Sequence, residues 1–124
     1  MIKWISLAFR LLAALVLAQT LFYKFTAAAE SVFIFQTLGA EPAGRIAAGV
    51  IELVIVILLL IPRTAMIGSV LGAGTMLGAI ASHLFVLGVV VMEDRGLLFG
   101  LAVFTLVCCT IAFLLERKRM AHST

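Results

Sequence analysis

The sequence predicts an all-α membrane protein, a bundle of four transmembrane helices with a short amphipathic segment between the first and second. Hydrophobic residues make up 65% of the 124-residue chain and charged residues 12%, whereas soluble domains are about half apolar and a quarter charged. Four apolar runs are each long enough to cross a bilayer. Little chain remains outside these runs, so residues 1–124 are expected to form a single integral membrane domain.

The first helix is expected at about residues 4–22. It starts at Trp4, a residue type that favours the membrane–water interface. Arg10 interrupts the apolar run near one end of this helix. We expect its guanidinium to reach the lipid headgroups, because long cationic side chains near helix ends extend in this way.

The second helix is expected at about residues 42–61, and Pro62 ends it because proline cannot continue a helix. The segment 24–42 before it is the least apolar part of the chain. Its residues 32–38 predict a short amphipathic helix that stops at Gly39. Such a segment lies in the interface or folds over the mouth of the bundle.

The third and fourth helices are expected at about residues 65–92 and 97–115. Small residues spaced four apart let membrane helices approach closely, and the third helix has such residues on two opposite faces. We therefore expect this helix to be wedged between two neighbours, inside the bundle or at a homodimer contact. One face carries Gly68, Gly72, Thr75, Ala79, Ser82 and His83, and the other carries Gly74, Gly78 and Ala81.

Several classes of function find no support in the sequence. The adjacent Cys108 and Cys109 point about 100° apart on a helix, which suits small core residues better than a disulfide. The sequence has no CxxC, HExxH, GxSxG or P-loop motif and no evident metal ligand set. Its net charge of +3 lies mostly at the termini, without an aromatic-interleaved basic stripe for nucleic acid. These absences favour a protein without catalytic activity of its own.

The basic residues predict the orientation in the membrane. Cytoplasmic loops carry an excess of Lys and Arg. If four helices alternate, Lys3, Arg63 and residues 117–119 fall on one side, and this side has more basic residues than the other. Both termini are therefore expected in the cytoplasm. The other side would carry Lys24, Arg45 and Arg95.

Ionisable groups inside the apolar runs are the candidate ligand-binding residues. Glu52 lies well inside the second helix, where a carboxylate costs roughly 2.5–3.5 kcal/mol on insertion scales. His83 is expected at a matching depth on the antiparallel third helix, since both lie roughly 13 Å below the same membrane surface at 1.5 Å per residue. Together they predict a polar pocket that opens outward. Nearer its opening we expect Gln19, Tyr23, Lys24 and Arg45.

Each of these candidates has a structural alternative. Glu52 and His83 either bind a ligand or relay a proton, or they satisfy one another and fix the helix register. For Lys24 and Arg45, each at a helix end, anchoring at the interface is the stronger interpretation.

Short motifs run through residues 8–115 in a characteristic order: Lys24, Glu30, Leu38-Gly39, Arg45…Gly49-x-x-Glu52, the run 58–64, and Met76-x-Gly78-Ala79…His83-Leu84. In order and spacing they resemble the DoxX family of small bacterial membrane proteins. This resemblance implies a four-helix bundle in the bacterial cytoplasmic (inner) membrane. It also implies polar site residues at Lys24, Glu30, Arg45, Glu52 and His83, and a link to terminal oxidases and thiosulfate–quinone oxidoreduction.

The leading hypothesis is a ligand-binding or partner subunit of a membrane redox system. Its pocket would hold a quinone or another lipid-like molecule, and its partners would be membrane lipids and a redox enzyme subunit. A second hypothesis is an assembly protein whose glycine faces dock another membrane protein or a second copy. A small proton-coupled transporter is the third, and the lack of an inverted repeat or broken helix pair weakens it.

Overall fold

The computed structural model describes residues 1–26, 29–88 and 96–123, and these residues form helices and no strand. The predicted all-α, four-helix bundle is confirmed. Four long helices make up the bundle, and a short helix, α2, lies between the first two of them. The helices are α1 (Ile2–Phe25), α2 (Ala29–Thr37), α3 (Ala43–Leu60), α4 (Ala65–Ser82) and α5 (Leu97–Ser123).

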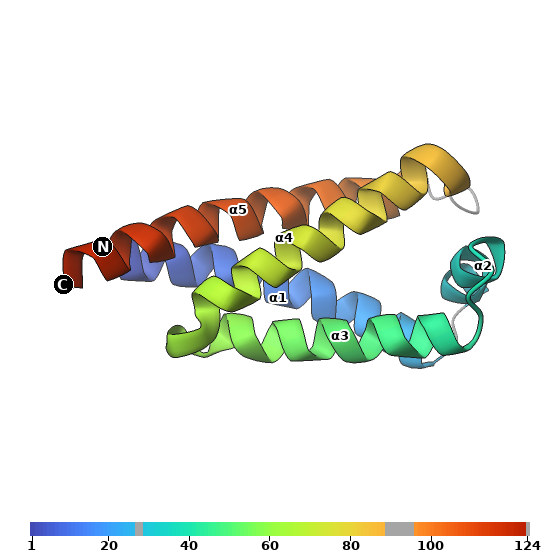
Figure 1. Cartoon of the computed structure of the whole chain (residues 1–124), viewed down its shortest axis with the longest axis horizontal. Coiled ribbons are helices and arrows are strands. Elements are labelled where there is room, and N and C mark those ends of the chain that lie inside the picture. The colour runs from blue at the N-terminus through green and yellow to red at the C-terminus, as the bar shows by residue number, and fades with distance from the viewer. Residues whose placement is uncertain (27–28, 89–95, 124) are drawn as a thin grey trace.

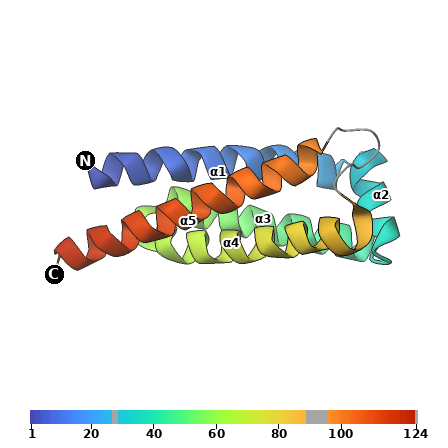
Figure 2. The same ribbon diagram turned by 90° about the horizontal axis from the view of Figure 1, so that it is seen from above.

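The four long helices form a ring in which each packs against two neighbours, in the order α1, α3, α4, α5. Both termini lie at one end of the bundle and α2 lies at the other (Figures 1 and 2). The short turn η1 (Pro62–Thr64) joins α3 to α4 near the terminal end. From this turn, α3 and α4 diverge toward the α2 end (Figure 1).

Four helical segments are long and apolar enough to cross a membrane: Ile2–Phe25, Ala43–Leu60, Pro62–Leu87 and Phe99–Met120. Large apolar side chains remain exposed on their outer faces, among them Ile51, Val54, Ile67 and Leu77. Exposed apolar surface of this extent marks contact with lipid. The chain is thus a multi-pass membrane protein, and its orientation stays a prediction.

Three of the expected helix bounds differ from the structure. The first and last helices extend to residues 2–25 and 97–123, because no glycine or proline interrupts them at the predicted ends. The α-helical part of the third ends earlier, at Ser82. A π-helical segment, η2 (His83–Leu87), follows, and Gly88 ends it with φ +81°. The expected residues 89–92 lie outside the described part.

One of the two glycine faces of α4 packs closely inside the bundle, as predicted. A methyl group added at Gly68 would lie 2.8 Å from the backbone nitrogen of Leu59 on α3. One added at Gly72 would lie 2.8 Å from Sγ of Cys109 on α5. Cys108 and Cys109 are free thiols in the buried core.

The opposite glycine face does not pack against the described part of the chain. A methyl group at Gly74 or Gly78 would meet no atom within 4 Å among the described residues. The expectation that α4 is wedged on both sides inside the bundle is therefore wrong. Among the described long helices, α3 and α5 pack beside α4, and they meet it at Gly68 and Gly72 on its other side. A homodimer contact through Gly74 and Gly78 stays a prediction.

Arg10 also differs from its prediction, because it points into the bundle and not toward the headgroups. Its side chain is buried, and Nη1 donates a hydrogen bond of 2.7 Å to the carbonyl of Leu59. Its Nε lies 3.9 Å from a carboxylate oxygen of Glu116. The last carbonyls of a helix lack hydrogen-bond partners within that helix. Arg10 donates to one of these carbonyls at the end of α3. Its positive charge is also attracted to the negative end of the helix dipole there.

Candidate functional site

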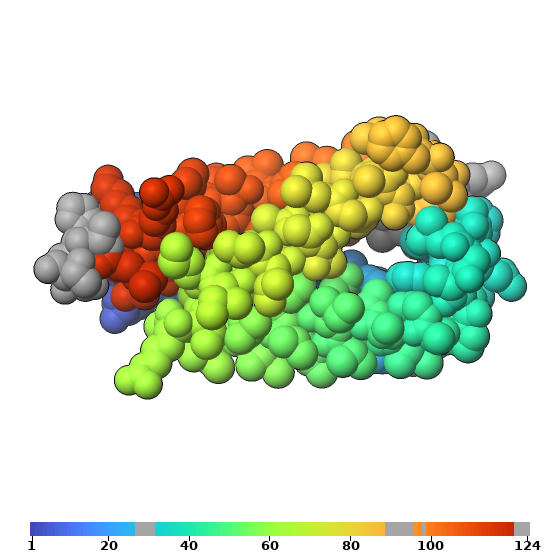
Figure 3. Space-filling view, in the orientation of Figure 1, coloured from blue at the N-terminus to red at the C-terminus, as the bar shows by residue number. Residues whose placement is uncertain are grey.

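A cavity of about 640 Å³ occupies the end of the bundle away from the termini. It lies between the long helices, and Figure 3 shows the hollow between α2 and α4. Most of its lining side chains are apolar. Its polar lining residues are Gln19, Thr20, Tyr23, Lys24, Glu52, Thr75, Ser82 and His83.

The cavity follows from the divergence of α3 and α4. Small side chains line it where larger ones would close the gap, among them Ala48 on α3 and Ala79 on α4. The helix α2 contacts α1, α3 and η2, and its Phe35 lines the cavity. Of the two expected placements of this segment, the structure therefore favours folding over the bundle mouth.

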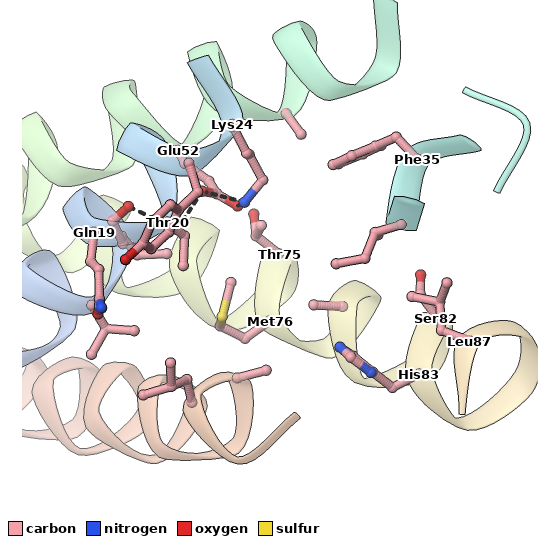
Figure 4. Close-up of a pocket in the computed structure, with 18 of the residues that line it drawn as sticks. Gln19, Thr20, Lys24, Phe35, Glu52, Thr75, Met76, Ser82, His83 and Leu87 are labelled. Carbon is pink, nitrogen blue, oxygen red and sulfur yellow. Dashed lines mark hydrogen bonds and ion pairs between the residues drawn. The ribbon is translucent and has the colours of Figure 1, made fainter. Parts of the chain in front are cut away.

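Glu52 is paired with a cation at the cavity wall. Nζ of Lys24 lies 3.0 Å from one carboxylate oxygen of Glu52 and 3.1 Å from the other (Figure 4). Oγ1 of Thr20 lies 3.1 Å from the same carboxylate and 2.8 Å from the carbonyl of Leu17, so these two acceptors share one hydroxyl proton. The Lys24 side chain is only 14% exposed. Interface anchoring therefore does not describe Lys24.

His83 lies on another wall of the same cavity, at the first position of η2. Its ring is buried, points into the cavity (Figure 4), and packs edge-to-face on Phe99 at 5.7 Å between ring centroids. Nδ1 is hydrogen-bonded to the carbonyl of Gly88 at 3.0 Å. Glu52 and His83 have different partners, so the alternative in which they satisfy one another is wrong.

The structure brings five of the seven predicted site residues to this cavity. They are Gln19, Tyr23, Lys24, Glu52 and His83. Their role as a binding site stays a prediction.

Arg45 and Glu30 are the two predicted residues outside that set. Arg45 does not line the cavity. Its Nε donates to both carboxylate oxygens of Glu41 at 2.9 and 3.0 Å, and its Nη1 donates to the carbonyl of Lys24. Arg45 thus ties the start of α3 to the end of α1 and fixes the backbone that carries Lys24. Glu30 belongs to α2, and its side chain lies outside the described part.

Sequence reasoning missed three hydroxyl groups in the cavity lining. Thr20 stands one helical turn before Lys24 on α1, a spacing that places both on one face. Thr75 and Ser82 were assigned to the same face as His83 but not to the site. In the described ranges, no group of three or more His, Cys, Asp or Glu side chains is arranged to hold a metal ion.

Fold and site together define a four-helix, multi-pass membrane protein with a largely apolar cavity bordered by the Lys24–Glu52 ion pair. Comparison with protein-family models, curated proteins and solved structures finds no match to the chain. The resemblance to the DoxX family rests on the sequence motifs alone.

Proposed function

We propose that this chain binds a small amphiphilic, quinone-like molecule in the cavity, as a ligand-binding or partner subunit of a membrane redox system in the bacterial inner membrane. One observation carries the proposal: the Lys24–Glu52 ion pair borders a hollow of about 640 Å³ whose other walls are mainly apolar. Ligand sites have this character, with volumes of roughly 300–1,000 Å³, apolar walls and a few polar groups that orient the ligand.

The ion pair leaves hydrogen-bonding capacity for a ligand. An ammonium group has three N–H donors. The two oxygens of Glu52 take at most two of the three donors of Lys24. At least one N–H of Lys24 is then available to a carbonyl or hydroxyl oxygen of a ligand head group. The amide of Gln19, which both donates and accepts, also lines the cavity.

The surroundings of the cavity favour a ligand that is dissolved in the bilayer. The hollow is visible on the outside of the protein between α2 and α4 (Figure 3). Beside it, the outer side of η2 presents Leu84, Phe85 and Val86, with Phe85 83% exposed. A lipid-soluble molecule thus meets apolar surface before it reaches the ion pair. The DoxX resemblance adds the association with quinone-linked redox systems to this proposal.

Two adjacent alanines on α3 provide a matched test. Ala48 lines the cavity, whereas Ala47 is exposed and does not. Ala48→Phe should fill part of the cavity and Ala47→Phe should leave it open. We expect mass spectrometry of lipid extracts to find a quinone or another amphiphile enriched with the wild-type protein and Ala47→Phe, and depleted with Ala48→Phe. Equal enrichment in the three proteins, or none in any, would count against a ligand in this cavity.

A second candidate function is membrane assembly, and the exposed glycine face of α4 favours it. Gly74 and Gly78 present a small-residue surface that nothing in the described chain covers, and such surfaces associate with other helices in membranes. We expect Gly78→Cys to form a disulfide-linked dimer in native membranes if a second copy covers this face. A redox enzyme subunit on the same face would block that cross-link and co-purify instead.

A further inference from the structure

The hydrogen bond of His83 depends on an unusual local backbone. His83 begins the five-residue π-helical segment η2, and Gly88 follows with φ +81°. Glycine suits this left-handed conformation because it has no Cβ. Gly88 follows His83 by five residues in the chain. The π-helical turn and the glycine together bring the carbonyl of Gly88 to 3.0 Å from Nδ1 of His83. Single π-helical turns within helices frequently occur at functional sites.

This hydrogen bond decides which nitrogen of His83 carries the proton. A carbonyl oxygen only accepts, so Nδ1 must donate, and in a neutral imidazole the other nitrogen is then an acceptor. Free imidazole side chains favour the opposite tautomer, with the proton on Nε2, so the Gly88 carbonyl selects the less common form. No hydrogen-bond partner for Nε2 lies among the described residues, and the ring points into the cavity (Figure 4).

Other polar groups of the cavity lining are also compatible with a ligand that donates a hydrogen bond. The carboxylate of Glu52 already accepts from Lys24 and Thr20. The hydroxyls of Thr75 and Ser82 donate their protons to carbonyls of their own helix at 2.8 and 2.9 Å, so toward a ligand they too act only as acceptors. Gln19 offers both a donor and an acceptor, so it does not discriminate between ligands of the two kinds.

We propose that Nε2 of His83 accepts a hydrogen bond from the ligand, and that the cavity therefore prefers a ligand with a hydroxyl group over the same skeleton with an ether or carbonyl oxygen. This inference rests on the proposed function, because it assumes that an amphiphile enters the cavity. To the proposed function it adds that the ligand's head group donates a hydrogen bond. For a quinone-like molecule, the reduced form with its phenolic hydroxyls is the better ligand.

The test uses 4-nonylphenol and its methyl ether, 4-nonylanisole, which share an apolar body but differ in hydrogen-bond donation. Each is titrated into the full-length protein in detergent micelles. The methyl resonance of Met76, which lines the cavity, reports binding of either compound independently of His83. One net hydrogen bond corresponds to a few-fold to about tenfold in affinity. We expect the phenol to bind more tightly than the ether by this factor.

Two variants assign the preference to a residue. In His83→Phe, which keeps an aromatic ring beside Phe99, the two compounds should bind equally. In Ser82→Ala, which removes a polar cavity group from the adjacent position, the preference should persist. In ligand-free wild-type protein, ¹⁵N spectra of His83 should show the proton on Nδ1, and this measurement does not depend on either variant folding.

Each other outcome has a definite meaning. If neither compound perturbs Met76, the proposed function fails and this inference fails with it. If both compounds bind the wild-type protein equally, the cavity binds amphiphiles but His83 does not select among them. A preference that persists in His83→Phe, or a ¹⁵N spectrum with the proton on Nε2, overturns the inference and leaves the proposed function standing.

Discussion

Two glycines on α4 allow the packing of the bundle to be tested with nearly identical substitutions. Gly68 faces the backbone of α3, and a methyl group there would lie 2.8 Å from the nitrogen of Leu59, 2.9 Å from Cβ of Leu58 and 3.0 Å from its carbonyl carbon. Gly74, less than two turns away on the same helix, would meet nothing within 4 Å. We predict that Gly68→Ala destabilises the protein and that Gly74→Ala does not.

The difference can be estimated from these distances. Carbon atoms in contact normally lie about 3.5–4.0 Å apart, so α3 would have to move by roughly 0.5–1 Å to admit the methyl group at Gly68. Overpacking of this kind costs about 1–3 kcal/mol. Both substitutions also gain about 0.5–1 kcal/mol from the higher helix propensity of alanine. Because this gain cancels between the two variants, Gly68→Ala should be less stable than Gly74→Ala by about 1–3 kcal/mol.

The assay is reversible unfolding in mixed micelles with increasing denaturing detergent, followed by circular dichroism. Gly74→Ala should equal or exceed the wild-type free energy of unfolding, and Gly68→Ala should fall below it. If the two variants unfold together, α3 and α4 are not in backbone contact at Gly68. The explanation of the cavity by helices held together at one end would then fail as well.

Three further predictions concern the buried charges and the orientation. Arg10→Met should lower the free energy of unfolding by about 1.5–3 kcal/mol, because it removes the hydrogen bond of a charged donor to the end of α3, whereas the exposed Arg63→Met should have little effect in the same detergent titration. Lys24→Met should lower the free energy of unfolding by about 3–5 kcal/mol, because it leaves Glu52 without its cation. When Lys24→Met is combined with Glu52→Gln, the two effects should deviate from additivity by about 0.5–3 kcal/mol. Additive effects would contradict the ion pair. A reporter fused after Thr124 should be active in its cytoplasmic form, and activity of a periplasmic reporter at that position would reverse the orientation.

The fold could be predicted from hydropathy because a membrane-spanning helix needs a long apolar run, and such a run is readable without tertiary information. The same holds for one face of α4. Helical periodicity places Gly68, Gly72, Ala79 and His83 on one side. The structure shows that this side makes the close contacts at one end and the cavity wall at the other.

Periodicity did not identify Lys24 as the partner of Glu52, because the C-terminal end of the first helix was predicted three residues too early. Predicting the first helix to stop at residue 22 left Lys24 in the interfacial segment, free to point to the headgroups. The helix continues to Phe25, which places Lys24 one turn after Thr20 and turns both toward Glu52. An error of three residues at a helix end therefore changed the interpretation of a cation from anchor to cavity wall.

Arg10 was misjudged for a different reason. Its position in the sequence fits snorkelling as well as burial, and only the rotation of α1 within the ring decides between them. The partner it meets is a backbone carbonyl at the end of α3, a group that the sequence pattern does not mark. The π-helical turn at His83 is equally hidden, because it shifts backbone hydrogen bonds without changing the apolar composition around them.

The cavity follows from the size of the side chains on neighbouring helices. Because Gly68 has no side chain, α3 and α4 can approach closely near η1, and the two helices diverge from there. At the terminal end, buried side chains such as Arg10 and Glu116 fill the space between helices and pair with one another. At the α2 end, the lining includes Ala48 and Ala79, where larger side chains would fill the space. Protein interiors are otherwise packed without such voids, and filling them usually stabilises the fold. An ion pair at the wall of a space left unfilled is therefore more consistent with a site for a ligand than with a device for stability.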